Sequence, residues 1–301
     1  MNVFICRTSL QLYLSKKISK KVQGTSLYIY INSSERLDEN VVLKEVDFYI
    51  DLKTCKNPIY NVYKHVVGWW KLKSLLVSLN IKKIFVSSID NILILKTFDC
   101  FQHRCEFYSF DDGFANYNYD GPYYKDLRSI SYKILGFFML QKATIFNLKE
   151  NIKEHYALRP EKRNLSGNII GVELSSDSSK GARRGVVKIF IGTVYSVYGL
   201  SSNSSVLKNL VETMDVYLPH PSEPSPIKSL KRNFLNLAEI EVLRMTEQYE
   251  EVHLYGFMST VLINLCSIDN VFITLIETEK SPSSEILNGF VNEVITINVE
   301  K

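Results

Sequence analysis

The chain has 301 residues, of which 46% are hydrophobic and 23% are charged, and its formal net charge is +4. This composition is typical of a globular protein and favours two domains of ordinary size over one. The mild charge does not indicate a protein dedicated to nucleic-acid binding, which concentrates basic residues on one face. It suits an anionic small molecule or an anionic membrane surface as partner.

Alternating strands and helices are predicted along the first half of the chain. Short apolar runs predict strands at residues 2–6, 26–31, 83–87 and 106–110. Apolar positions at helical spacing predict helices at residues 9–22 and 60–79. The apolar run Ile134 to Leu140 is expected to form a core helix, and Trp69 and Trp70 are expected to be core residues. This alternation predicts a parallel sheet covered by helices on both faces.

Residues 173–185 are rich in Ser and Gly, lack periodicity and are predicted to be a linker. The same alternation then resumes. Strands are expected at residues 186–191, 216–218, 252–255 and 271–275, and helices at residues 204–214, 235–249 and 259–266. The sequence therefore predicts an α/β fold with one domain at residues 1–172 and another at 186–301. Two such domains facing each other would enclose a cleft at the carboxyl ends of their strands.

No metal site, disulfide framework or membrane-spanning segment is predicted. The five cysteines are odd in number and irregularly spaced, and Cys100 and Cys105 have only His103 nearby as a further ligand type. We expect reduced cysteines in a cytoplasmic protein. No apolar run approaches the roughly 18 residues that a spanning helix needs, and the N-terminal apolar run lacks the marks of a signal peptide.

Asp111, Asp112 and Gly113 directly follow a predicted strand. A carboxylate beside a second negative charge has a raised proton affinity, which suits a general base. The same residues could equally form a plain Asp-Gly turn or a helix cap.

His220 lies between Pro219 and Pro221, just past another predicted strand. Because a proline restricts the backbone of the preceding residue, His220 is held in a way that suits donation to an anion or a leaving group. The alternative is a loop histidine between turn-forming prolines.

Two further strand-to-helix turns carry hydroxyl groups. In the turn that contains Gly256, Ser259 and Thr260, free N–H groups and hydroxyls could bind a phosphate, or Ser259 could simply cap the helix. The first turn of the chain, with Thr8 and Gln11, could face the same cleft or could also be a plain cap.

Together these segments resemble the bacterial sialyltransferases of glycosyltransferase family 52, typified by lipooligosaccharide sialyltransferases. The resemblance covers most of the chain. It rests on CRTSLQ at residues 6–11, FDDGFANY at 110–117, YLPHPSE at 217–223, AEIEVL at 238–243 and LYGFMSTVLINL at 254–265. Ser9 stands where the family usually has proline, and AEIE departs from the family's usual Ala-Glu-Asp.

The resemblance implies a GT-B arrangement of two Rossmann-like domains, CMP-sialic acid as donor, inversion at the anomeric carbon, and neither metal nor other cofactor. It implies that Asp112 is the general base with Asp111 as its neighbour, and that His220 donates to the departing CMP phosphate. The first domain would carry the acceptor side and the second would bind CMP. Donor contacts are expected from Thr8, Gln11, Pro221, Glu239, Gly256, Ser259 and Thr260, with Glu239 on the cytidine. Weaker expectations place Asn116 and Tyr117 on the acceptor.

The expected acceptor is a terminal galactose-type hydroxyl of a bacterial surface glycan, either lipooligosaccharide or capsule. Two alternatives stay open: a related transferase, such as a glucosyltransferase, that uses another nucleotide sugar, and a non-catalytic nucleotide- or glycan-binding protein on the same scaffold. The tyrosines that follow the carboxylates could form an acceptor platform or pack in the core; they are Tyr117, Tyr119, Tyr123 and Tyr124.

A homodimer and a peripheral contact with an anionic membrane are further options, and nucleic acid is not expected as a partner. One helical face carries Lys16, Lys17, Lys20 and Lys21. This face is either solvated or docks to anionic lipid at the inner side of the cell membrane.

Overall fold

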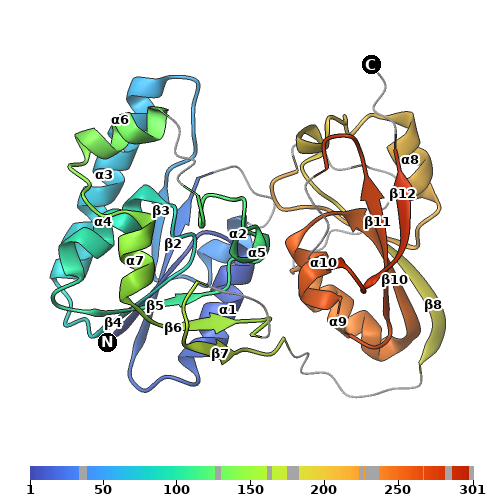
Figure 1. The fold of residues 1–301 in the computed structure, drawn as a ribbon, viewed down its shortest axis with the longest axis horizontal. Coiled ribbons are helices and arrows are strands. Elements are labelled where there is room, and N and C mark those ends of the chain that lie inside the picture. Colours follow the sequence, from blue (N-terminus) through green and yellow to red (C-terminus); the bar gives the residue numbers. More distant parts are fainter. Residues whose placement is uncertain are drawn as a thin grey trace. The chain divides into compact units, whose positions relative to one another are not determined.

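The computed structural model describes residues 1–33, 39–125, 130–160, 165–174, 183–223, 227, 237–266, 268–281 and 287–297. The chain divides into two compact units, the first ending at Glu173 and the second beginning at Leu174 (Figure 1). Most of the predicted linker, residues 175–182, lies outside the described residues.

The first unit is built on a seven-stranded sheet with the order β3-β2-β1-β4-β5-β6-β7. Every neighbouring pair in this sheet runs parallel. Its strands are β1 (Asn2–Cys6), β2 (Ser26–Asn32), β3 (Phe48–Asp51), β4 (Lys83–Val86), β5 (Glu106–Phe110), β6 (Ile152–Ala157) and β7 (Ile169–Gly171). Its helices are α1 (Ser9–Ser19), α2 (Glu39–Leu43), α3 (Pro58–Val77), α4 (Ile92–Phe101), α5 (Phe114–Tyr117), α6 (Ile130–Phe138) and α7 (Ile145–Asn151).

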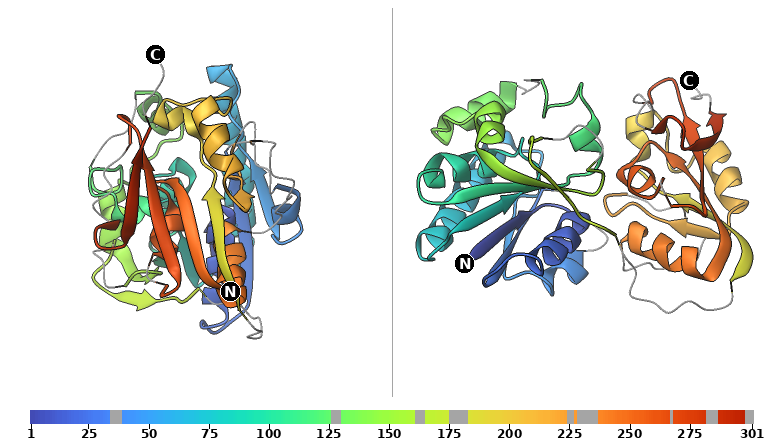
Figure 2. Two further views of the ribbon diagram at one scale, coloured as in Figure 1. Left: turned by 90° about the vertical axis from the view of Figure 1, so that its right-hand side faces the viewer. Right: turned by 60° about the horizontal axis from the view of Figure 1, so that its bottom comes forward.

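The second unit is built on a five-stranded sheet with the order β12-β11-β10-β8-β9, again parallel throughout. Figure 2 shows its strands running side by side. The strands are β8 (Arg184–Ile191), β9 (Val216–Leu218), β10 (Tyr249–Phe257), β11 (Val271–Glu277) and β12 (Val291–Thr296). The helices are the 3₁₀ turn η1 (Tyr195–Tyr198), α8 (Ser205–Glu212), α9 (Ala238–Gln248) and α10 (Thr260–Leu265).

The predicted fold class, two α/β domains with parallel sheets of the GT-B type, is confirmed. Buried strands such as β1 and β5 begin and end where their apolar runs do. Strands β3, β6, β7 and β12 were not predicted. The last of these is largely exposed and β7 has only three residues, so neither shows the apolar run by which a parallel strand is recognised.

Two predictions of burial were wrong. The run Ile134 to Leu140 is not a core helix, because Ile134, Phe137, Phe138 and Leu140 are all exposed to solvent. Trp69 is buried as expected, but Trp70 points in another direction from α3 and is exposed. Adjacent helical residues point about 100° apart, so the two tryptophans cannot share one face.

Within the described ranges, no helix combines the length and the apolar character that crossing a membrane requires.

Candidate functional site

The first candidate site lies at the carboxyl edge of the first sheet. Strands β1, β4 and β5 are neighbours and run in the same direction, so the residues that follow them gather at one edge. Thr8 follows β1, Ser88 follows β4, and Asp111 and Asp112 follow β5. Gly113 turns the chain away from β5 with a φ of +63°, a conformation that glycine adopts without strain.

Asp112 is partly exposed and accepts hydrogen bonds from side chains that are distant in the sequence. One carboxylate oxygen accepts a hydrogen bond from the Gln11 amide, and the other accepts one from the Tyr123 hydroxyl. Gln11 is itself fixed, because its carbonyl oxygen accepts from the backbone N–H of Arg7 at 2.6 Å and of Thr8 at 3.3 Å. The carboxylate is therefore oriented before any substrate binds.

Burial raises the pKa of the Asp112 carboxyl above its ordinary value. Hydrogen bonds from Tyr123, Ser88 and Gln11, together with the positive charge of Arg7, oppose that rise. Desolvation, and not the charge of Asp111, is the main cause of the raised proton affinity, which corrects the reason deduced from the paired carboxylates. A carboxylate in this state can take a proton from a neighbouring hydroxyl.

Asp111 is buried, and its carboxylate accepts hydrogen bonds from three groups of the surrounding chain. Its Oδ1 accepts from the Gly113 N–H at 2.7 Å, and its Oδ2 accepts from the Tyr117 hydroxyl at 2.7 Å and from the Leu158 N–H at 3.0 Å. Burial raises the pKa of this carboxyl to about 6. These contacts tie the loop after β5 to the chain after β6.

Asn116 and Tyr117, the expected acceptor contacts, are both buried behind the carboxylates. The Asn116 amide lies 3.0 Å from Nε2 of the buried His155, and its Oδ1 accepts from the Asp112 N–H at 3.3 Å. Both residues thus form hydrogen bonds with the two aspartates, and neither side chain is exposed enough to contact a sugar. Among the other tyrosines, Tyr123 is buried against Asp112, whereas Tyr119 is exposed and meets Tyr124 edge to face.

The turn at Thr8 and Gln11, a candidate donor contact, is a capping box on α1. The Thr8 hydroxyl accepts from the Gln11 N–H at 3.2 Å, as the alternative interpretation of this motif proposed. Gln11 has a second role beyond this cap, because its amide also donates hydrogen bonds to Ser88 and Asp112.

Three further residues of this site were not expected to take part in it: Ser88 and Asp90 lie outside the recognised motifs, and Arg7 lies within CRTSLQ without an assigned role. Ser88 has a φ of +43°, which is strained for a residue other than glycine and is typical of functional sites. Arg7 donates to the Ser33 hydroxyl at 2.9 Å, but within the described part of the chain its buried Nε has no hydrogen-bond partner. Burial raises the pKa of Asp90, as does the charge of Asp112, while Arg7 lowers it. No local sequence pattern places these three residues beside Asp112; the parallel sheet does so by bringing the ends of its strands together.

Removing the Tyr123 hydroxyl should change the pH dependence of any reaction that uses Asp112 as a base. This hydrogen bond lowers the pKa of Asp112, so Tyr123→Phe should raise it further. The acid limb of the pH–kcat/KM profile should then move to higher pH, since a base acts only when deprotonated. Tyr124→Phe is the matched control, because its hydroxyl donates to the Asn116 carbonyl and not to a carboxylate. A Tyr123→Phe profile that coincides with the wild-type profile would contradict this role.

The second candidate site lies at the carboxyl edge of the second sheet. Strands β9, β8 and β10 are neighbours, and they are followed by His220, Gly192 and Ser259 respectively. His220 is half-buried, and its Nδ1 accepts from the Ser222 N–H at 3.1 Å. In the neutral imidazole the proton is therefore on Nε2, which makes Nε2 the donor.

The loop that carries His220 is organised by Glu223, whose role was not recognised from the sequence. The Glu223 carboxylate is buried and accepts from the Tyr217 hydroxyl and, at 3.2 Å, from the His220 N–H. Tyr217 in turn lies 3.1 Å from the Tyr195 hydroxyl. Burial raises the pKa of Glu223 to about 7. The proline-flanked histidine is thus fixed by a buried hydrogen-bond network as well as by its prolines.

Gly192 makes room for this loop. A Cβ at this position would lie 2.7 Å from Glu223 Oε2, 2.9 Å from the His220 nitrogen and 3.0 Å from the Leu218 oxygen. Two of these atoms are backbone and the third is a buried carboxylate, so a side chain here must displace the His220 loop.

Gly192→Ala should therefore lower the activity of a protein that uses His220 by about 10-fold or more, because small misplacements of a catalytic group are costly. Gly185→Ala, on the strand β8 that precedes Gly192, is the control, since nothing lies within 4 Å of a Cβ there. Steady-state kinetics with circular dichroism would check both. Full activity of Gly192→Ala would show that the position of the loop does not matter.

The remaining candidate donor residues lie in the same unit. Ser259 caps α10, its hydroxyl accepting from the Leu262 N–H at 3.4 Å, and Thr260 is the first residue of that helix. Gly256 lets β10 approach β8, because a Cβ would meet the Ile191 oxygen at 3.3 Å. Glu239 is buried on α9, accepts from the Asn264 amide at 3.2 Å, and has a pKa raised by burial. Pro221 is half-buried beside His220.

Comparison with known proteins gives one family and two similar enzymes. The model of glycosyltransferase family 52 matches residues 55–280. An N-acetyllactosaminide alpha-2,3-sialyltransferase of Haemophilus influenzae is 26% identical over 307 residues, covering 92% of this chain and 92% of the relative. A CMP-N-acetylneuraminate:beta-galactoside alpha-2,3-sialyltransferase of Pasteurella multocida is 21% identical, covering 93% of this chain and 92% of the relative.

Among solved structures, a UDP-N-acetylglucosamine 2-epimerase superposes with a TM-score of 0.50 at 10% identity. The match covers 100% of this chain and 84% of the epimerase. At this level of identity the likeness concerns the fold alone.

Proposed function

Because the chain belongs to glycosyltransferase family 52, we propose that it transfers sialic acid from CMP-sialic acid to a galactose-type hydroxyl of a bacterial surface glycan. Both similar enzymes are named sialyltransferases and match the chain almost end to end. The observation that carries the proposal is the Asp112 carboxylate, which is partly exposed, oriented by Gln11 and Tyr123, and raised in proton affinity by burial.

In the proposed reaction, Asp112 takes the proton from the acceptor hydroxyl as its oxygen attacks the anomeric carbon of the donor. The bond from that carbon to the CMP phosphate breaks, and the configuration at the carbon inverts. Asp111 holds the loop in place and does not contact the substrate. Because burial raises its proton affinity, the Asp112 carboxylate is a better proton acceptor in this step than an exposed carboxylate.

Departure of CMP is assigned to the second unit. His220 donates through Nε2 to the phosphate oxygen on which negative charge develops, and Ser259 and Thr260 hold the same phosphate. Glu239 hydrogen-bonds the cytidine, and Pro221 restrains His220. Gly256 contributes through the close approach of β10 to β8.

We propose that the reaction needs no divalent metal and no other cofactor. A nucleoside monophosphate leaving group carries its charge at the reaction centre, so a histidine and N–H donors can stabilise it in place of a cation. Among the residues that the structure describes, no group of three or more His, Cys, Asp or Glu side chains is arranged to hold a metal ion. Activity should survive excess EDTA, and loss of activity with rescue by magnesium or manganese would overturn this part of the proposal.

The test of the function is a donor and acceptor assay. The purified chain is incubated with CMP-sialic acid, or with UDP- and GDP-sugars, and with a panel of galactose-terminated glycans, and product mass and linkage are measured. We expect a sialylated product from CMP-sialic acid only. Transfer from another nucleotide sugar would identify a different transferase, and absence of both transfer and donor hydrolysis would identify a binding protein.

The cytoplasmic location, the homodimer and the contact with an anionic membrane stay predictions. The basic face of α1 offers weaker support for membrane contact than its sequence indicated, because Lys16 forms an ion pair with Glu45 at 2.7 Å.

A further inference from the structure

Exposed apolar side chains follow the outer face of α3. Ile59, Tyr63, Trp70 and Val77 are spaced by four, seven and seven residues, so they lie along one side of the helix. Ile59 is 80% exposed and Trp70 is 61% exposed. The opposite face, with Trp69, Leu72 and Leu76, packs in the core of the first unit. The helix is therefore apolar on both sides, which packing within this unit does not explain.

A second group of exposed apolar side chains lies on α6 and the turn that follows it. Phe137 is 76% exposed and Leu140 is 74% exposed, and Ile134 and Phe138 are also exposed. Both helices belong to the layer on one side of the sheet, since residues of α3, α4, α6 and α7 contact the same hydrophobic core cluster (Figure 1). We call the exposed residues Ile59, Tyr63, Trp70, Val77, Ile134, Phe137, Phe138 and Leu140 the apolar surface.

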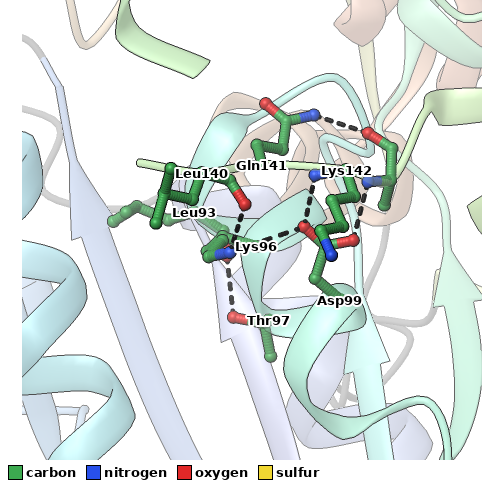
Figure 3. Close-up of polar contacts among 8 residues, drawn as sticks. Leu93, Lys96, Thr97, Asp99, Leu140, Gln141 and Lys142 are labelled. Carbon is green, nitrogen blue, oxygen red and sulfur yellow. Dashed lines mark hydrogen bonds and ion pairs between the residues drawn. The ribbon is translucent and has the colours of Figure 1, made fainter. Parts of the chain in front are cut away.

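The turn after α6 is fixed in position by hydrogen bonds to two side chains of α4, Lys96 and Asp99 (Figure 3). The Lys96 ammonium donates to the Leu140 carbonyl at 2.7 Å and lies 3.7 Å from Asp99. The Asp99 carboxylate accepts from the backbone N–H groups of Lys142 at 2.8 Å and Ala143 at 2.6 Å.

Leu140 has a φ of +50°, a strained conformation for a large side chain. A strained residue persists only where its surroundings enforce it, so the exposure of Leu140 is a built feature of the fold.

The chain around the apolar surface is basic. Residues 52–89, which contain α3, include no Asp or Glu but seven lysines, and residues 127–149, which contain α6, include no Asp or Glu either. Two of the lysines lie over aromatic rings of α3: Lys64 is 5.3 Å from the Tyr60 ring centre and Lys73 is 5.4 Å from that of Trp70. Aromatic and aliphatic side chains beside lysines, without acidic residues, are the composition of helices that lie in a membrane interface.

We propose that the apolar surface docks the first unit on a bilayer that contains anionic lipid. Phe137, Phe138 and Leu140 enter the boundary between headgroups and acyl chains, Trp70 and Tyr63 lie at headgroup level, and the lysines contact lipid phosphates. A second copy of the chain is a poorer occupant. A two-fold interface brings the same surface together, and here it would oppose lysines to lysines with no acid on α3 or α6 to pair with them.

The proposed membrane docking is a property separate from the transfer reaction and does not depend on it. One consequence does rest on the proposed function: docking would place the enzyme where a lipid-linked glycan is presented.

The test is binding to vesicles. Full-length protein is mixed with vesicles of phosphatidylcholine alone or with phosphatidylglycerol, and the bound fraction is measured by co-sedimentation. We expect binding only to the anionic vesicles and a fall of about 10-fold or more in high salt, which screens the lysines. Phe137→Ser with Phe138→Ser should reduce the partition coefficient by at least about 100-fold, because the apolar contact is lost. Val186→Ser with Val294→Ser, exposed valines of the second unit, should bind like wild type.

Tryptophan fluorescence gives a direct measure of depth, since Trp69 and Trp70 are the two tryptophans of the chain. Lipids brominated in the acyl chain should quench the Trp69→Phe variant, which keeps the exposed Trp70, and should leave Trp70→Phe unquenched. Equal quenching of both variants, or no binding to anionic vesicles, would overturn the proposal. So would a wild-type dimer that the Phe137/Phe138 variant converts to a monomer, because the surface would then join two copies.

Activity on a water-soluble galactoside separates this proposal from the enzymatic one. The surface variants should keep turnover within about twofold of wild type, since none of the changed residues contacts either candidate site. A wild-type chain that binds vesicles but transfers no sugar would contradict the proposed function and leave the docking surface standing.

Discussion

Replacing Asp112 by asparagine is expected to lower turnover by at least about 100-fold while donor binding persists. The change removes the proton-accepting group at almost constant size. The fold should tolerate it, because the Tyr123 hydroxyl that donates to the carboxylate can instead accept from an amide. Single-turnover kinetics with CMP-sialic acid would give the rate of the chemical step, and calorimetry would give donor affinity. Near-normal turnover would exclude Asp112 as the base.

Asp111→Asn is the neighbouring control, and its expected defect is of a different kind. Asp111 accepts from the Gly113 N–H on one oxygen and from the Leu158 N–H on the other. An asparagine must turn its NH2 group toward one of these backbone donors, which cannot reverse their roles. We expect a loss of about 1–3 kcal/mol in the free energy of unfolding and a milder loss of turnover per folded molecule. Equal losses of turnover in the two variants would leave the identity of the base undecided between them.

Replacing His220 by alanine is expected to lower turnover by about 100- to 1,000-fold, with a smaller effect on the KM for the donor. The reason is that Nε2, the proton-bearing nitrogen when Nδ1 accepts from the Ser222 N–H, donates to the phosphate as charge develops there. The loop should keep its conformation, because Glu223 contacts the His220 backbone and not its ring. Steady-state kinetics and thermal unfolding would measure both effects.

A donor with a better leaving group provides the control for His220. Such a donor needs less stabilisation as it departs, so the deficit of His220→Ala should shrink with it. An equal deficit with both donors, or a loss of donor affinity alone, would make His220 a binding residue and not the group that assists departure.

The fold class and the placement of the main motifs could be predicted from the amino-acid sequence. An apolar run bounded by polar residues is local information, and a strand buried on both faces can be recognised from it. For this reason β1, β5 and β9 were predicted at their observed limits, and Asp112 and His220 were correctly placed just past strand ends. The Thr8 cap was also predictable, because a capping box involves residues only three positions apart.

The contacts that support these residues could not be predicted from the sequence, because they join segments that are far apart in the chain. Gln11 and Asp112 are 101 positions apart in the chain, and no local pattern links them. The same is true of Gly192. A side chain at this position would collide with Glu223 and His220, which are far from it in the sequence. The raised pKa of Asp112 likewise depends on burial, which only the packed fold creates.

Exposure shows the limit of the sequence most clearly. The run Ile134 to Leu140 has the composition of a core helix, but its large side chains are exposed. An apolar composition indicates that side chains are more stable away from water. It does not indicate whether another part of the chain packs over them. Tyr132 and Leu135 of α6 pack against the core cluster, whereas Ile134, Phe137 and Phe138 of the same helix are left exposed. Whether an apolar helix becomes core or surface is therefore decided by long-range packing.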